Sequence, residues 1–310
     1  MSTQRPNPVP PPRRVVVVGG VTAEVVMAVS EPPERGGASR AQDALARAGG
    51  GYPVLAAARR AGLDAALAGV IGTGAMARLV GRALRREGIR VLLPDRPGEQ
   101  GFSVVFTEET GRPTRVAAPG VEATLNADDL ARVRLAADDV AYVSAQDLID
   151  PVCGPAIAQW CGAGLGQALL VLDPGPLVSD VPDDVLDAVL ARTDVLALGR
   201  HELELLSGRR VAPKGEGAAE GGDRDGEALA ALAGLLADEA IVLLRSADGY
   251  LLREHDGSTY SFPGDEPGPP RLRHVVHLLG HLAQVRASQP ARTLGGVTPG
   301  HHVAALLLAD

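Results

Sequence analysis

The sequence predicts an α/β fold built around a mostly parallel β-sheet. Short, continuous apolar runs, typical of strands that are buried on both faces, recur along the chain and begin with VVVVGG at residues 15–20. These runs alternate with amphipathic segments long enough to form helices, an order typical of strands joined by helical crossovers. Two further apolar segments, 101–109 and 114–120, flank a Thr-Gly-Arg-Pro turn and predict an antiparallel addition to the sheet.

The individual elements follow from local signals. Gly62 is placed to end the first Ala-rich helix as a C-cap, and Asp128 and Asp129 favour the first turn of the third helix. The Asp256-Gly257 pair predicts a β-hairpin. The expected strands cover residues 15–20, 21–29, 64–72, 89–94, 101–109, 114–120, 139–145, 168–176, 193–199 and 240–249, with the hairpin at 250–263. The expected helices cover residues 48–62 (after a Gly-rich turn), 77–88, 127–135, 151–164, 182–192, 201–208 and 227–238.

Three segments lack a helical or strand pattern. Residues 1–14 are rich in proline and are expected to be disordered, residues 30–47 are polar and irregular, and residues 212–226 read as a flexible Gly-rich loop. We expect the remaining chain, residues 15–310, to form one domain.

The composition excludes several classes of protein. The chain has 310 residues, of which 45% are hydrophobic and 22% charged, so it can bury a sizeable core. Its net charge of −8 argues against nucleic-acid binding through a basic surface. No apolar run is long enough for a membrane span, and the N-terminus lacks a signal core, so we expect a cytoplasmic protein. Cys153 and Cys161 are too few for a disulfide scaffold or a cysteine-built metal site.

The C-terminal part of the chain differs in composition from the rest. Residues 267–309 hold no Asp or Glu, although the whole chain has 38, and they hold five of the seven His residues. Uniform composition would place about six carboxylates in such a stretch. His274, His277 and His281 lie at helical spacing, but the stretch offers no carboxylate to support a zinc site, so we expect no metal there.

Several blocks, in order, resemble the ribokinase-like (PfkB) family of carbohydrate kinases over roughly residues 14–266. They are VVVVGGVTAE, AGGGYPVLAAARRAGLDAALAGVIGTGAMARLVGRALRREGI (48–89), RVAAPGVEATL (115–125) and LDPGPLVSD…LGRHELELLSG (172–208). The resemblance implies a ribokinase-like three-layer α/β/α fold with a small β lid, built from segments near 21–30 and 101–120. It also implies phosphoryl transfer from ATP, with Mg²⁺, to a sugar hydroxyl, and a homodimer formed through the lid.

The resemblance assigns substrate-binding positions near the first strand. The family's sugar-holding Asp falls on Glu24, which keeps a carboxylate, and its di-glycine falls on Gly49, Gly50 and Gly51. A solvated charge on a lid strand and a plain strand-to-helix turn are the structural alternatives for Glu24 and the glycines. The Asn that usually follows is Pro53 here, which loses a polar contact to the sugar.

The resemblance also assigns nucleotide and magnesium positions. The family's N-x-x-E region aligns with residues 199–202, where Glu202 is kept and the Asn is Gly199. Arg245 lies where the family begins its nucleotide loop. Helix capping by Glu202 and a surface position for Arg245 are the alternatives.

The family's C-terminal motif, D-T-x-G-A-G-D, is absent. It supplies the anion hole and the catalytic Asp base. Its best alignment, with residues 273–285, places Gly280 at the anion hole and Ala283 at the base; another, with residues 295–309, also lacks an Asp. The catalytic residue therefore stays unassigned.

Three hypotheses remain open from the sequence. The chain is a diverged sugar kinase with impaired catalysis, a non-catalytic relative that binds a ligand or partner, or a kinase whose C-terminal codons are read in a shifted frame. The last explains the acid-free stretch and the missing motif together, but it does not explain Pro53 and Gly199.

Overall fold

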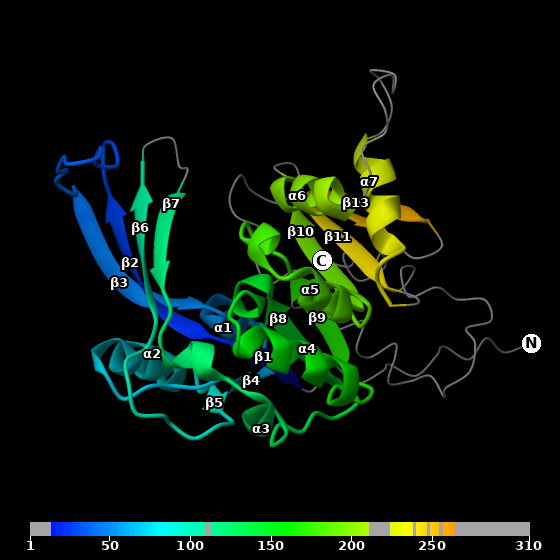
Figure 1. The fold of residues 1–310 in the computed structure, drawn as a ribbon, viewed down its shortest axis with the longest axis horizontal. Coiled ribbons are helices and arrows are strands. Elements are labelled where there is room, and N and C mark those ends of the chain that lie inside the picture. The colour runs from blue at the N-terminus through cyan, green and yellow to red at the C-terminus, as the bar shows by residue number, and fades with distance from the viewer. Residues whose placement is uncertain are drawn as a thin grey trace, which may run out of the picture.

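Two β-sheets organise the chain. The structure is a computed structural model that describes residues 14–108, 113–210, 224–237, 240–246, 249–253 and 257–263. Within this part of the chain, nine strands form the larger sheet in the order β13-β12-β11-β10-β9-β8-β1-β4-β5, and four strands form the smaller sheet in the order β3-β2-β6-β7. Figure 1 shows the smaller sheet, called the lid below, standing to one side of the larger one.

The larger sheet is mostly parallel, as predicted. Its parallel strands run from β5 to β11, and β12 and β13 form the predicted antiparallel hairpin at one edge. The strand bounds are β1 Arg14–Val18, β4 Asp64–Ala68, β5 Arg90–Val91, β8 Asp139–Ser144, β9 Leu169–Asp173, β10 Val195–Gly199, β11 Ile241–Ser246, β12 Gly249–Arg253 and β13 Thr259–Pro263. β1 begins at Arg14, the last residue of the segment expected to be disordered.

Helices cover both faces of this sheet, which gives three layers. α1 and α2 pack on one face, where Leu55 and Val80 join Val15 and Val17 in the core. The other helices pack on the opposite face. The helix bounds are α1 Tyr52–Arg60, α2 Ala75–Arg86, α3 Ala127–Leu130, α4 Cys153–Ala163, α5 Asp183–Leu190, α6 Arg200–Arg210 and α7 Arg224–Ala233, with the 3₁₀ helices η1 Val121–Thr124, η2 Ala145–Leu148 and η3 Val178–Asp180. No described helix is both long and apolar enough to span a bilayer.

The lid contains one strand that the sequence analysis missed. β2 (Val21–Ala28), β6 (Phe102–Thr107) and β7 (Pro113–Ala118) lie in the two predicted lid segments, but β3 (Asp43–Gly50) falls partly in the stretch expected to be irregular. β3 is a largely exposed edge strand, so it lacks the apolar pattern of a buried strand. The pairing of β2 with β6 is parallel, so the added sheet is mixed and not purely antiparallel.

Some boundaries also differ from prediction. Gly62 does follow α1 with a φ of +83°, as a C-cap glycine should. Gly208, however, lies inside α6 and does not end it. α7 begins at Arg224, within the segment expected to be a loop. α3 ends at Leu130, and the stretch to residue 135 is not helical.

Candidate functional site

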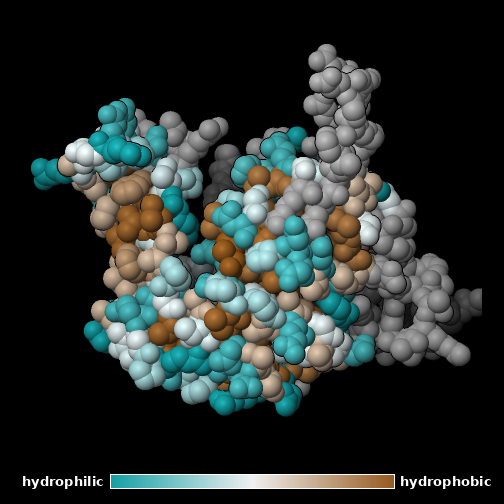
Figure 2. Space-filling model, in the orientation of Figure 1, coloured by the Kyte–Doolittle hydropathy of each residue, from teal (hydrophilic) through white to brown (hydrophobic). Residues whose placement is uncertain are grey.

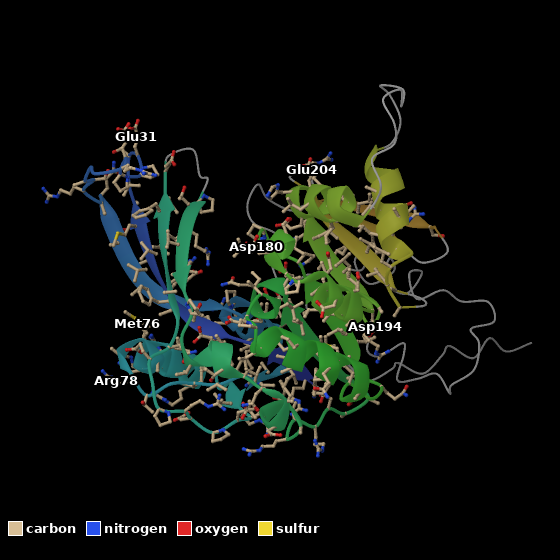
Figure 3. The ribbon with its side chains drawn as sticks, viewed as in Figure 1. Glu31, Met76, Arg78, Asp180, Asp194 and Glu204 are labelled. Carbon is tan, nitrogen blue, oxygen red and sulfur yellow. The ribbon has the colours of Figure 1, made fainter. Side chains whose placement is uncertain are left out.

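The carboxyl ends of the parallel strands meet at one edge of the larger sheet, where open α/β sheets bind ligands. Gly19 follows β1, Ser144 ends β8 and pairs with Asp173 at the end of β9, and Gly199 ends β10 and pairs with Arg245 on β11. The lid rises beside this edge, and Figure 2 shows a notch between the lid and the larger body. In Figure 3, Asp180 on η3 lies on the body across from the lid, and Met76 on α2 lies below it.

Two acidic side chains enclose the turn between β1 and β2. The backbone N–H of Gly20 donates a hydrogen bond to Oδ1 of Asp147 at 2.8 Å. A Cβ added to Gly20 would lie 2.9 Å from Cγ of Glu122 and 3.0 Å from Oδ1 of Asp147. A Cβ added to Gly19 would lie only 2.2 Å from Oδ2 of Asp147. The two glycines therefore allow the carboxylates to approach the backbone closely.

The carboxyl group of Asp147 has a raised pKa at this position. Burial raises its pKa to about 7, and the nearby acids Glu122 and Asp150 add to the rise, while the hydrogen bond from Gly20 opposes it. The carboxyl group therefore changes charge near neutral pH.

Glu122 ties the lid to the body. Its carboxylate accepts hydrogen bonds from the backbone N–H groups of Gly101 and Gly120, each at 2.8 Å, and from Nε2 of Gln100 at 3.1 Å. Gln100, which is 1% exposed, also donates to the carbonyl of Val21 at 2.7 Å. These bonds join the starts of β2 and β6 to the segment that follows β7.

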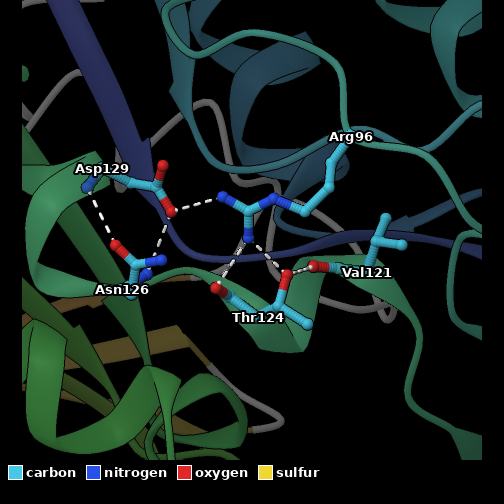
Figure 4. Close-up of polar contacts among 5 residues, drawn as sticks. All are labelled: Arg96, Val121, Thr124, Asn126 and Asp129. Atoms are coloured by element: carbon cyan, nitrogen blue, oxygen red, sulfur yellow. Dashed lines mark hydrogen bonds and ion pairs between the residues drawn. The ribbon is translucent and has the colours of Figure 1, made fainter.

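A second set of contacts anchors the same segments. Nη2 of Arg96, in the loop between β5 and β6, donates to Oδ2 of Asp129 at 2.8 Å, and Nη1 donates to the carbonyl of Thr124 at 2.8 Å. Asn126 and Asp129 form a capping box at the start of α3 (Figure 4). The lid thus enters and leaves the body through hydrogen-bonded segments.

Glu24 lies on β2, in the middle of the lid, and is 4% exposed. Its Oε2 accepts from Nε of Arg47 on β3 at 3.0 Å, and its Oε1 accepts from Nη1 of Arg115 on β7 at 2.6 Å. Both carboxylate oxygens are therefore held by arginines. A Cβ on Gly49 would lie 2.3 Å from Cγ of Glu24, so the glycine provides the space for this side chain.

Gly50 and Gly51 pack against the β1–β2 turn. Gly50 has a φ of +60°, and a Cβ there would lie 2.8 Å from the carbonyl oxygen of Gly20. The N–H of Gly51 donates to the same oxygen at 2.9 Å, and a Cβ on Gly51 would lie 2.4 Å from Cγ1 of Val17. Backbone packing explains both glycines locally. Pro53 lies in the first turn of α1, where its missing N–H breaks no helical hydrogen bond.

Glu202 and Arg245 both lie near Asp173, farther along the edge. Oδ2 of Asp173 accepts from the hydroxyl of Tyr142 at 2.8 Å. Burial raises the pKa of Asp173; the positive charge of Arg245 and the Tyr142 hydrogen bond oppose that rise, and Glu202 adds to it. Among the described residues, the buried Nε of Arg245 has no hydrogen-bond partner. The sequence-predicted nucleotide residues therefore lie together, around an acid that was not predicted.

Glu202 caps the helix that it belongs to. Its Oε2 accepts from the N–H of Gly199 at 2.9 Å, and a Cβ on Gly199 would lie 2.6 Å from that oxygen. The glycine that replaces the family's Asn thus leaves room for Glu202 to turn back on the start of α6. This is the capping alternative left open by the sequence.

The remaining predicted positions, Gly280 and Ala283, lie outside the described residues, as do the five C-terminal histidines. Within the described residues, no group of three or more His, Cys, Asp and Glu side chains could hold a metal ion. Asp147, Glu122 and Asp173 were missed. An acid at or just after the carboxyl end of a predicted parallel strand is a signal that could have identified Asp147 and Asp173.

Comparisons with known proteins identify the family. The family model described as "pfkB family carbohydrate kinase" matches residues 12–264. A curated protein of Escherichia coli (strain K12), described as "Uncharacterized sugar kinase YegV", is 29% identical over 156 residues, which is 50% of this chain and 48% of that protein. The match thus spans about half the length of this relative.

Solved structures share the fold at low sequence identity. Ribokinase from Giardia lamblia has a TM-score of 0.69 at 13% identity, covering 96% of this chain and 90% of that one. Adenosine kinase from Sinorhizobium meliloti has a TM-score of 0.68 at 13% identity, covering 93% of each chain. These similarities confirm the predicted ribokinase-like fold, and the family model extends over well more than half of the sequence. The chain belongs to the pfkB family of carbohydrate kinases.

Proposed function

We propose that this chain transfers a phosphoryl group from ATP to a hydroxyl group of a sugar or similar polyol. The observation that carries the proposal is the two-part arrangement at one edge of the sheet. The lid and its base, with Glu24, Gly50 and Gly51, offer the acceptor side, and Glu202 and Arg245 near Asp173 offer the nucleotide side. A structural neighbour, ribokinase from Arabidopsis thaliana, is described as complexed with ribose and ATP.

The nucleotide side fits a magnesium–ATP complex. Mg²⁺ is usually held by one or two carboxylates together with substrate phosphates. Asp173 and Glu202 supply two carboxylates close enough to influence each other, and Arg245 supplies a positive charge for phosphate. When bound, the ion would neutralise charge on the phosphates, and these side chains would orient it.

Catalysis in this chain is expected to be slow. The family's base position aligns with Ala283, and the family match ends at residue 264, three residues before the acid-free stretch begins. Alanine cannot accept the proton of the attacking hydroxyl. Loss of a general base costs about 10²–10⁴-fold in rate, so turnover can persist at a low level.

Two alternatives rest on specific observations. The capping role of Glu202 and the replacement of the family Asn by Gly199 favour a non-catalytic relative that binds a ligand or partner. The coincidence between the end of the family match and the change in composition favours a kinase with a frame-shifted C-terminus.

Turnover of ATP by the purified protein, measured against a panel of sugars and nucleosides, tests the proposal. We expect slow ADP formation that depends on one acceptor and falls at least tenfold in Glu202→Ala. Glu204→Ala, at an exposed position on the same helix, is the matched control and should keep the rate. Ligand binding without any acceptor-dependent turnover would instead support the non-catalytic alternative.

The proposal includes a homodimer formed through the lid. Phe102 and Val116 lie on the same face of the lid and are 37% and 66% exposed. Exposed apolar side chains on one sheet face favour association. Size-exclusion chromatography with light scattering should show a dimer, and Val116→Glu should shift it toward the monomer.

A further inference from the structure

The lid presents a cluster of two arginines around one buried carboxylate. Arg47 on β3 lies directly opposite Glu24 in the β2–β3 register, and Arg115 reaches Glu24 from β7, two strands away on the other side. The side chain of Glu24 is 6% exposed, whereas those of Arg47 and Arg115 are 59% and 41% exposed. With two positive charges and one negative, the cluster carries a net positive charge at the surface of an acidic protein.

This cluster lies on the side of the lid that continues to the carboxyl edge of the sheet. Alternate residues of a strand point to the same face, so Thr22 and Glu24 of β2 share one side. Gly20, just before β2, continues the pairing with β3, because its carbonyl accepts the N–H of Gly51 at 2.9 Å, so it lies on that side too. That side, at Gly20, meets Asp147 and Glu122. The opposite side carries Ala23 and Ala48, which are buried with Ala77 of α2. The arginines therefore belong to the face turned away from α2 and toward the site.

Most hydrogen-bond donors of the cluster are unused. A guanidinium has five N–H donors, and Arg47 and Arg115 each commit one to Glu24. Neither side chain makes another hydrogen bond within the described part of the chain. Ser103, which pairs with Glu24 in the β2–β6 register, is 3% exposed, and its Oγ has no hydrogen-bond partner among the described residues. A buried hydroxyl without a protein partner is unusual, and its Oγ can pair with a ligand group or a water.

An ordinary cross-strand ion pair does not account for the whole cluster. One arginine would neutralise Glu24, and exposed ion pairs contribute little to stability. Two arginines held by the two oxygens of one buried carboxylate instead keep further N–H donors exposed beside it, and arginine N–H donors suit a carboxylate or phosphate group.

We propose that the Arg47–Arg115 pair, positioned by Glu24, binds an anionic group of the acceptor substrate, which makes the preferred substrate a sugar acid or a sugar monophosphate. The inference rests on the proposed function, because it specifies the substrate of the same site. Glu24 is about 13 Å along the strand from Gly20, so the anionic group would lie at the end of the substrate away from the turn. In this arrangement Glu24 is a positioning residue, and the arginines contact the substrate.

Binding without ATP tests the inference independently of turnover. Calorimetry and thermal shift would compare D-glucose with D-gluconate and D-glucose 6-phosphate, and D-ribose with D-ribonate and D-ribose 5-phosphate, with inorganic phosphate measured alongside. We expect at least one acidic member to bind at least tenfold more tightly than its neutral parent, and more tightly than inorganic phosphate. The measurements with D-gluconate and D-ribonate test for recognition of a carboxylate, and those with the two sugar phosphates test for recognition of a phosphate monoester.

Variants then assign the preference to the cluster. Arg115→Gln and Arg47→Gln should each weaken the acidic ligand at least tenfold while changing the neutral parent less than threefold. Arg115→Lys keeps the charge and should recover part of the affinity. Arg35→Gln, at an exposed position in the loop between β2 and β3, removes the same charge outside the cluster and should leave binding unchanged.

The outcomes separate this inference from the proposed function. The inference is overturned if the acidic and neutral ligands bind with equal affinity, or if neither binds. It is also overturned if the preference for the acidic ligand survives in the folded Arg47→Gln/Arg115→Gln double variant. Turnover of a neutral sugar would leave the proposed function standing. Selective binding of an acidic sugar without turnover would support the inference while contradicting the kinase activity.

Discussion

Asp147 holds its carboxyl group against the Gly19–Gly20 turn, where burial and neighbouring acids oppose ionisation. Its pKa of about 7 in the folded chain exceeds the ordinary value of 3.8, so the folded state binds this proton more tightly than the unfolded state. The sign follows from linkage: stability falls as pH rises from about 4 to about 7, and the loss is complete above pH 7.

Asp147→Asn should therefore become more stable than the parent as pH rises. The Asn Oδ1 can still accept the Gly20 N–H, and the charge is gone. The gain should be negligible near pH 4 and should reach up to about 4 kcal/mol at pH 8. Thermal unfolding of both proteins between pH 4 and pH 8.5 measures it. Asp95→Asn, at an exposed acid, should show no such trend; a constant difference for Asp147→Asn across this range would contradict the assignment.

Part of the candidate site could be predicted from the sequence. Glu24, Glu202 and Arg245 could be selected because their positions match family motifs, and the structure places Glu202 and Arg245 near one acid. The two arginines around Glu24 could not be found, because they come from β3 and β7 and meet only when the lid folds. Local sequence carries no information about such pairings across strands.

At the scale of elements, the join between β3 and α1 depends on glycine geometry. Gly50 combines a positive φ with a backbone oxygen 2.8 Å from its missing Cβ, so both conformation and space exclude a side chain. This join fixes the lid strand against the β1–β2 turn, next to the acceptor side of the site.

Gly50→Ala should lower the free energy of unfolding by about 1–3 kcal/mol, because the strained φ and the steric clash act together. Chemical denaturation measures the change. The matched control is Gly162→Ala in α4, where no atom lies within 4 Å of the added Cβ and helix propensity predicts a gain of up to about 1 kcal/mol. Equal stability of the two variants would show that the join tolerates a side chain.

The sequence predicted elements well where burial leaves a pattern and poorly elsewhere. Strands such as β1 and β9, buried on both faces, stand out as continuous apolar runs. β3 is exposed along most of its length, so it leaves no clear pattern. β5 was predicted, but it has only two residues and is much shorter than the strand expected over 89–94. Some helix ends were also misplaced. Gly208 was expected to end its helix, yet α6 continues past it to Arg210.

At the scale of the whole molecule, the described fold and the C-terminal composition lead to different expectations. The larger sheet, its helices and the lid reproduce the family's architecture, and the family match covers them up to residue 264. From residue 267 to 309 the chain has no acid, so no residue there can serve as the family's carboxylate base. A duplication or loss of one or two nucleotides near codon 267 would change every later residue and leave the preceding fold intact, which matches both facts.

The nucleotide sequence of the coding region tests this explanation directly. We expect one of the other two reading frames, just beyond codon 264, to encode a D-T-x-G-A-G-D motif. A protein expressed with that frame restored should turn over about 10²–10⁴-fold faster than the present chain, since it regains a general base. Replacing the final Asp of the restored motif by Asn should return the rate to the present level, which assigns the gain to the base rather than to folding. If neither frame encodes the motif, the departures from the family pattern at Pro53, at Gly199 and in residues 267–309 are all natural. The non-catalytic alternative then becomes the better explanation.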